Sequence, residues 1–170
     1  MSLKIHTLRQ EQWIPRPIDE VFRFFSDARN LEAITPPWLG FRILSVSTDS
    51  IAEGTEIRYR LKLHGIPVQW RTEICRWNPP HRFVDVQRSG PYKLWHHTHT
   101  FEAHGNRTRM IDVVRYTLPF GVLGRMVHVL KVRGDVQRIF AYRRKCIDEF
   151  FSKQKRSCDG KPQLPAAGAL

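Results

Sequence analysis

The sequence predicts an α+β fold in which a seven-stranded antiparallel sheet packs against one long C-terminal helix. Three observations predict it: a strand-like segment near the N-terminus, six strand-like segments between residues 41 and 118, and a helical repeat of apolar residues from about 135 to 152. The six segments alternate apolar and polar side chains, and only a few residues separate them. Such short connections join antiparallel neighbours, because parallel strands need long crossovers.

The first strand is expected over residues 3–14, where it ends at a Pro-Arg-Pro sequence. Proline cannot donate a hydrogen bond to a strand ladder, so the ladder should stop there. Two short helices should follow this strand. Asp19 is a candidate cap for the first helix, over residues 20–25, and Asp27 is a candidate cap for the second, over residues 30–34.

Turn-forming residues divide the middle of the chain into six strands. Glycine, proline and asparagine favour turns because of their backbone conformations and their lack of strand propensity. They gather at five places between residues 41 and 118, namely 52–54, 64–67, 78–81, 90–91 and 104–107.

The last long element is a helix that should begin near Asp135 and end at about Ser152. Apolar residues recur along it at helical spacing, and Arg143 lies on the same stripe. Residues 153–170 lack this periodicity and are rich in small and polar residues and proline. We therefore expect one domain over residues 1–152 and a flexible tail after it.

The composition is that of a globular protein with an excess of positive charge. The 170 residues are 41% hydrophobic and 26% charged, and the formal net charge is +12. The charge attracts anions in general, but no nucleic-acid-binding motif accompanies it, so no specific nucleic-acid partner is expected. There is no signal peptide and no apolar run of about 20 residues, which predicts a cytoplasmic protein. Three widely spaced cysteines, Cys75, Cys146 and Cys158, are expected to be free thiols.

Five stretches of the chain are similar to motifs of one known superfamily: Trp13–Phe22, Asp27–Leu31, Trp77–Phe83, Gly90–Tyr92 and Leu118–Gly121. They resemble the SRPBCC superfamily, which includes START lipid-transfer domains, birch-pollen allergen-like proteins and the aromatase/cyclases of polyketide synthesis. The resemblance covers about residues 1–152. Within it, Gly90–Phe101 resembles a bacterial subgroup of stand-alone domains that are also found joined to epimerase-like proteins called cell-division inhibitors.

The resemblance implies a helix-grip fold, in which a curved sheet wraps around the C-terminal helix. It also implies a cavity between sheet and helix for an apolar or amphipathic small molecule. Members of the superfamily bind lipids, sterols, polyketides or plant hormones, and only some are enzymes. The superfamily has no universal catalytic motif, so residue roles must come from the strand pattern.

Strand alternation predicts which side chains face the cavity, because successive side chains point to opposite faces of a sheet. The more apolar face of each strand, with the inner stripe of the helix, gives fifteen expected cavity residues: Tyr59, Leu61, Trp70, Thr72, Trp95, His97, His99, Phe101, Met110, Asp112, Val114, Tyr116, Ile139, Phe140 and Arg143.

One strand does not show which of its faces is inward. Its alternate residues are similar in character, so either of two sets could line the cavity: Phe83, Asp85 and Gln87, or Val84, Val86 and Arg88.

His97, His99 and Asp112 allow three interpretations. Two histidines two residues apart on one strand could chelate a metal, with Asp112 as a third ligand. An aspartate could instead orient a histidine for general acid/base catalysis. In the third interpretation, the one we favour, these groups hydrogen-bond one another and the polar end of a ligand. No metal or cofactor is therefore expected, and no catalytic residue is assigned.

The predicted function is binding of a hydrophobic or aromatic small molecule, lipid-like or polyketide-like, by a monomer or homodimer. One alternative is a cyclase, dehydratase or hydrolase that uses the cavity histidines. Others are lipid transfer at a membrane surface and a protein-interaction module. The apolar segment 122–130 is expected to form a pocket lid, although its basic neighbours would also suit peripheral contact with an anionic membrane.

Overall fold

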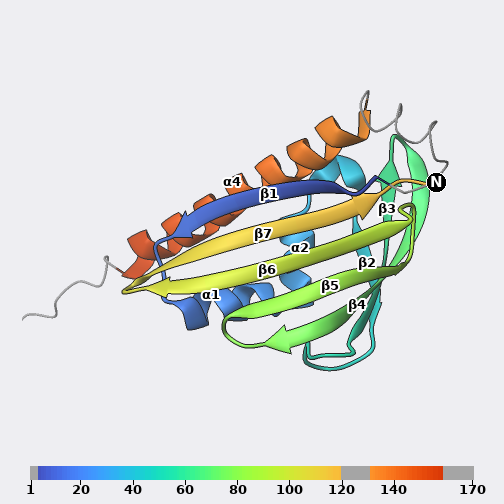
Figure 1. Ribbon diagram of the computed structural model, residues 1–170. Coiled ribbons are helices and arrows are strands. Elements are labelled where there is room, and N and C mark those ends of the chain that lie inside the picture. Colours follow the sequence, from blue (N-terminus) through green and yellow to red (C-terminus); the bar gives the residue numbers. More distant parts are fainter. Residues whose placement is uncertain (1–3, 120–130, 159–170) are drawn as a thin grey trace, which may run out of the picture.

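A computed structural model describes residues 4–119 and 131–158. It shows one seven-stranded antiparallel sheet in the order β1-β7-β6-β5-β4-β3-β2 (Figure 1). Strands β2 to β7 pair with their neighbours in sequence, and β1 pairs with β7 at one edge of the sheet. The elements are β1 (His6–Ile14), α1 (Ile18–Phe25), α2 (Ala28–Ala33), the 3₁₀ turn η1 (Pro37–Leu39), β2 (Arg42–Val46), β3 (Glu56–Leu63), β4 (Ile66–Asn78), β5 (Arg82–Ser89), β6 (Leu94–His104), β7 (Arg107–Thr117) and α4 (Arg133–Cys158).

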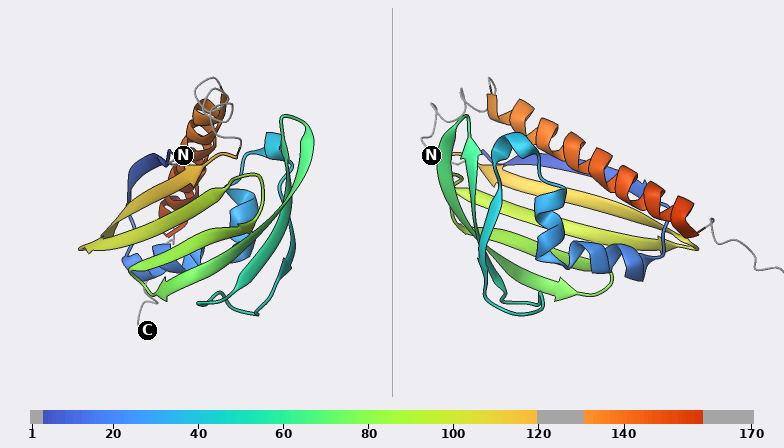
Figure 2. Two further views of the ribbon diagram at one scale, coloured as in Figure 1. Left: turned by 45° about the vertical axis from the view of Figure 1, so that its right-hand side comes forward. Right: turned by 180° about the vertical axis from the view of Figure 1, so that it is seen from behind.

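The described helices lie on the same side of the sheet, which curves toward them (Figure 2). The long helix α4 crosses the side of β1 and β7, while α1 and α2 lie beside it over the strands further along. This arrangement confirms the predicted α+β helix-grip fold with seven strands and two short helices after the first strand. No helix in the described part of the chain is long and apolar enough to cross a membrane.

A tight turn shows how the sequence sets the strand pairing. His64 and Gly65 join β3 to β4 with φ angles of 52° and 83°, and Leu63 pairs with Ile66 on either side of them. Two successive residues of positive φ match the right-handed twist of a hairpin, and glycine adopts that conformation without strain. The turn therefore fixes the register of β3 against β4.

The core between α1, α4 and the sheet is rich in aromatic rings. Phe22 of α1 contacts Trp77, Phe83 and Phe101, with ring centroids 5.1, 6.0 and 5.5 Å apart. Helix α4 buries four apolar side chains at helical spacing, Val136, Phe140, Ile147 and Phe151. Burying apolar surface of this kind is the main source of the stability of the fold.

A buried glutamine attaches α4 to the first strand. The Gln12 side chain is 5% exposed, and its Nε2 donates hydrogen bonds to the Arg144 carbonyl oxygen at 3.0 Å and to Oδ1 of Asp148 at 2.7 Å. A buried amide without such partners would destabilise the fold, so this pairing favours one position of the helix on the sheet.

One of the two expected helix caps is present. Asp19 is not a cap, because α1 already begins at Ile18 after Pro17; its carboxylate lies in the first turn, where it favours the positive end of the helix. Asp27 does cap α2, since its Oδ1 accepts a hydrogen bond from the Arg29 backbone N–H at 3.0 Å.

Helix α4 is longer than the helical repeat alone suggests. It begins at Arg133 and continues to Cys158, past residue 152, where the sequence analysis placed the end of the domain. The expected lid segment 122–130, and the end of the expected tail from residue 159 on, lie outside the described residues.

Candidate functional site

A cavity of about 140 Å³ lies between α2, the concave face of the sheet and one residue of α4. Most of its wall is apolar, and aromatic rings from α1 and the sheet contribute much of it, among them Phe25, Trp70, Phe83 and Trp95. A polar wall interrupts this surface where three side chains of β5 and β6 meet, and Arg143 of α4 adds a cation.

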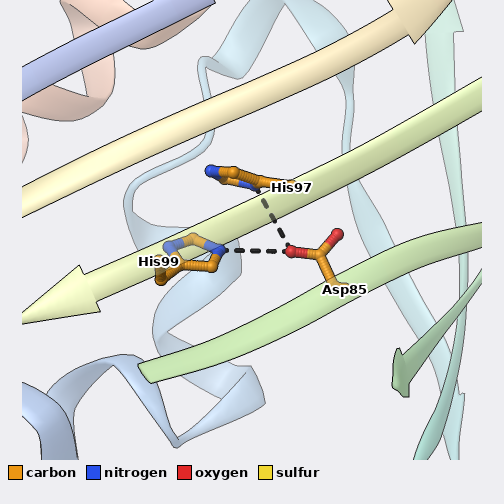
Figure 3. A group of neighbouring side chains, drawn as sticks. All are labelled: Asp85, His97 and His99. Carbon is orange, nitrogen blue, oxygen red and sulfur yellow. Dashed lines mark hydrogen bonds and ion pairs between the residues drawn. The ribbon is translucent and has the colours of Figure 1, made fainter. Parts of the chain in front are cut away.

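The strand pairing brings two histidines and two aspartates together. His97 and His99 point to the same face of β6 because they are two residues apart. In the sheet register Asp85 of β5 lies opposite His97, and Asp112 of β7 lies opposite His99. The four side chains, which we call the His–Asp quartet, therefore come from three adjacent strands. Figure 3 shows three of them, with both histidine rings turned toward Asp85.

Each imidazole of the quartet contacts both carboxylates. Oδ2 of Asp85 lies 3.3 Å from Nδ1 of His97 and 3.1 Å from Nε2 of His99. Oδ1 of Asp112 lies 3.0 Å from Nε2 of His97 and 2.8 Å from Nδ1 of His99. The last contact is close but poorly directed, and Nδ1 of His99 makes no hydrogen bond of good geometry.

The quartet is buried and strongly polarised. His97 and His99 are each 3% exposed. Burial alone lowers the pKa of His97, but the charge of Asp85 and the hydrogen bond with Asp112 outweigh it and raise that pKa to about 9. Burial raises the carboxyl pKa values of Asp85 and Asp112, yet the two histidines outweigh it and hold both well below their usual range. Both carboxylates and His97 are therefore charged at neutral pH.

The other polar groups of the cavity offer hydrogen bonds rather than a nucleophile. The Tyr59 hydroxyl lies 3.2 Å from the Thr72 hydroxyl, and burial raises the pKa of Tyr59 far above its usual value. No serine or cysteine belongs to the described cavity wall. The described part of the site therefore contains several proton donors and acceptors.

Two donors in the cavity wall have no partner among the described residues. Arg143 is half-buried and lies over the Phe140 ring, with Cζ 5.4 Å from its centroid, but it forms no ion pair or hydrogen bond with any described residue. The buried indole nitrogen Nε1 of Trp70 also lacks a hydrogen-bond partner there. Buried donors without partners destabilise a protein, so a ligand that accepts from them would be favoured.

The structure places seven of the fifteen expected cavity residues in the cavity wall: Tyr59, Trp70, Thr72, Trp95, His97, His99 and Arg143. The other eight lie outside it: Leu61, Phe101, Met110, Asp112, Val114, Tyr116, Ile139 and Phe140. Several of these eight residues lie outside the cavity wall because α4 packs directly on the side of β1 and β7. There Val114 and Tyr116 form a packed cluster with Val136 and Phe140 of the helix.

Sequence reasoning missed Asp85 and the contribution of α2. Asp85 belongs to one of the two sets of β5 residues between which the alternation did not decide, and the structure turns this set inward. The pairing of β5 with β6 was the usable signal, because it places Asp85 opposite His97. Asn30 and Leu31 of α2 also line the cavity, but a six-residue helix has no pattern that says what it will cover.

A curved antiparallel sheet that holds a C-terminal helix, with a cavity between them, defines a helix-grip domain. Residues 14–138 match the model of the family described as polyketide cyclase/dehydrase and lipid transport, and the chain belongs to that family. This confirms the resemblance to the SRPBCC superfamily. No curated protein matches the sequence.

Solved structures share the fold at low sequence identity. The Zhui aromatase/cyclase from Streptomyces superposes with a TM-score of 0.72 at 14% identity, over 93% of this chain and 100% of that one. A norcoclaurine synthase from Thalictrum has a TM-score of 0.68 at 13% identity, over 91% and 99%. A START superfamily protein from Mycobacterium smegmatis has a TM-score of 0.63 at 14% identity, over 88% and 99%. At these identities the likeness is one of fold.

Proposed function

We propose that this protein binds a small aromatic molecule with one anionic group, in the cavity between α2, the sheet and α4. The family supports hydrophobic ligand binding in general. The observation that carries the finer proposal is Arg143, a cation in an aromatic cavity wall without an acidic partner among the described residues. A carboxylate on the ligand would pair with it, and the ring would replace water against Trp70 and Trp95.

The volume of the cavity favours an aromatic ring over a long lipid chain. A cavity of about 150 Å³ holds one benzene molecule, whereas sites for larger ligands have about 300 to 1,000 Å³. The cavity here, at about 140 Å³, therefore fits one ring. A polyketide-like molecule of several rings would insert its end and leave the rest toward solvent. The description of the family as polyketide cyclase/dehydrase and lipid transport agrees with a ligand of this class.

The charge on the ligand should have a measurable effect. A hydrogen bond to a charged group contributes about 1.5 to 3 kcal/mol, which corresponds to roughly 10- to 100-fold in affinity. Loss of Arg143 should weaken binding of an anionic ring by that factor. It should change the binding of an uncharged ring of the same shape much less.

Phenylacetate and phenylacetamide make a suitable pair of probes, because they differ mainly in charge. Their binding can be followed by NMR through the indole N–H signal of Trp70, assigned with Trp70→Phe. We expect phenylacetate to bind more tightly than phenylacetamide, and Arg143→Gln to remove the difference. Arg144→Gln, one residue along α4 and exposed, is the matched control. Equal effects of the two substitutions, or no binding of either probe, would contradict the proposal.

A further inference from the structure

Three candidate metal ligands meet at one side of the His–Asp quartet. Asp85, His97 and His99 each offer one ligand atom, and these three atoms lie within 4.8 Å of one another (Figure 3). Oδ2 of Asp85 is 3.3 Å from Nδ1 of His97 and 3.1 Å from Nε2 of His99. Atoms bound to one ion at about 2.0 to 2.1 Å lie roughly 3.0 to 3.4 Å apart in tetrahedral or octahedral geometry. The two O···N distances at Asp85 are therefore similar to those between two atoms that bind the same metal ion.

The opposite nitrogens of both rings meet a single carboxylate. Oδ1 of Asp112 lies 3.0 Å from Nε2 of His97 and 2.8 Å from Nδ1 of His99. A histidine that binds a metal usually donates its other N–H to a carboxylate, which fixes the tautomer and the direction of the ring. Asp112 stands in that position toward both rings. Nδ1 of His99 itself makes no hydrogen bond of good geometry with Asp112.

The balance of charge also suits a divalent ion. One divalent ion, two neutral imidazoles and two carboxylates together have no net charge, so the occupied site would leave no unbalanced charge in a buried place.

We propose that Asp85, His97 and His99 bind one divalent first-row transition-metal ion, with Asp112 as the residue that orients both histidines. Two imidazoles and one carboxylate suit Zn²⁺, Fe²⁺ and Co²⁺. The three ligand residues line the cavity, whereas Asp112 does not belong to its wall. The remaining coordination positions therefore face the cavity, where water or an oxygen atom of a small molecule can occupy them.

The site can be tested without any organic ligand, so its result is independent of the proposed function. Protein treated with chelator and then dialysed is titrated with Co²⁺, whose visible absorption reports the ligand geometry, and with Zn²⁺ by calorimetry. We expect one equivalent of each ion to bind. Calorimetry in two buffers of different ionisation enthalpy should show that protons are released on binding, because a nitrogen that binds a metal ion must be deprotonated.

Substitutions assign the ligands. Asp85→Asn and His99→Gln should abolish the Co²⁺ spectrum, and Asp112→Asn should weaken binding about 10- to 100-fold without abolishing it. His104→Gln is the control, since His104 is exposed on the same strand. Binding that survives Asp85→Asn and His99→Gln but is lost in His104→Gln would place the ion on the surface and overturn the proposal.

The wild-type protein alone provides a second test, should a variant fail to fold. Co²⁺ shifts NMR signals in proportion to their distance and direction from the ion. We expect the largest shifts at β5, β6 and β7 around the quartet. A folded wild-type protein that binds no Co²⁺ or Zn²⁺ at 100-fold excess, or shifts centred on another part of the molecule, would refute the site.

Discussion

Replacing Asp85 with asparagine tests whether the quartet is an ionic part of the core. The substitution keeps the shape of the side chain but removes the negative charge that contacts Nδ1 of His97 at 3.3 Å and Nε2 of His99 at 3.1 Å. Both histidines are nearly buried, so the lost charge is not replaced by water. Removing one partner of a buried ion pair costs about 3 to 5 kcal/mol, because the other partner remains buried and unpaired.

The loss should be visible in thermal and urea unfolding. For a domain of this size each kcal/mol changes the melting temperature by about 2 to 4 °C, so Asp85→Asn should lower it by about 6 to 20 °C. Chelator is present throughout, so that only the metal-free protein is measured. Asp49→Asn is the control, because Asp49 is exposed and its substitution should change stability by less than about 0.5 kcal/mol.

A double-mutant cycle sharpens this prediction. Asp85 and Asp112 do not contact each other in any described interaction, but each contacts both histidines. Their substitutions by asparagine should therefore not be additive, with an interaction energy of at least about 0.5 kcal/mol. Additive effects, or a cost of Asp85→Asn below about 1 kcal/mol, would show that the quartet is not a coupled ionic cluster.

Three further predictions concern stability in the presence of chelator. Because the pKa of His97 is raised, its stabilising contribution is complete below the unfolded-state pKa of 6.5 and is lost as the pH rises through about 9. Because the carboxyl pKa of Asp85 is lowered, its contribution is present above about pH 4 and is lost in acid. Unfolding measured from pH 3 to 10 would contradict this if stability did not fall at both ends. Phe22→Ala should cost about 3 to 5 kcal/mol in urea unfolding, since the ring contacts three other aromatic rings, and a loss near that of a surface substitution would disprove the packing. Gly65→Ala should destabilise the protein by about 1 kcal/mol because the φ of Gly65 is 83°, although nothing lies within 4 Å of the added carbon. Gly134→Ala is the control, because this glycine lies in a helix with equally open space and its substitution should not destabilise the protein. Equal effects of the two substitutions would count against backbone strain at Gly65.

The fold could be predicted from the sequence because its signals are local. Period-two alternation and turn residues define six of the strands without knowledge of the rest of the chain, and His64-Gly65 illustrates how a turn also sets the register. The failures are local as well. Asp19 has the side chain of a cap, but Pro17 precedes it with a φ of −58° and α1 starts at Ile18, so the aspartate falls inside the first turn.

The site could be predicted only in part, because it depends on how distant elements meet. Alternation along β6 and pairing with β7 were enough to bring His97, His99 and Asp112 together. Alternation could not choose between the faces of β5, so the second carboxylate, Asp85, was missed. Nor does any strand pattern show the position of α4, which packs against Val114 and Tyr116, two residues that do not line the described cavity beside the quartet.

The quartet and Arg143 have separate electrostatic roles, and this separation decides the charge of the ligand. The carboxylates of Asp85 and Asp112 contact His97 and His99, and neither pairs with Arg143 in any described interaction. Arg143 remains the cation of the cavity wall that no described acid neutralises. An anionic ring should therefore be preferred over a neutral one whether or not the metal is bound. Measuring phenylacetate and phenylacetamide with and without Zn²⁺ tests this, because a preference that vanished without Zn²⁺ would assign the anion to the metal instead of Arg143.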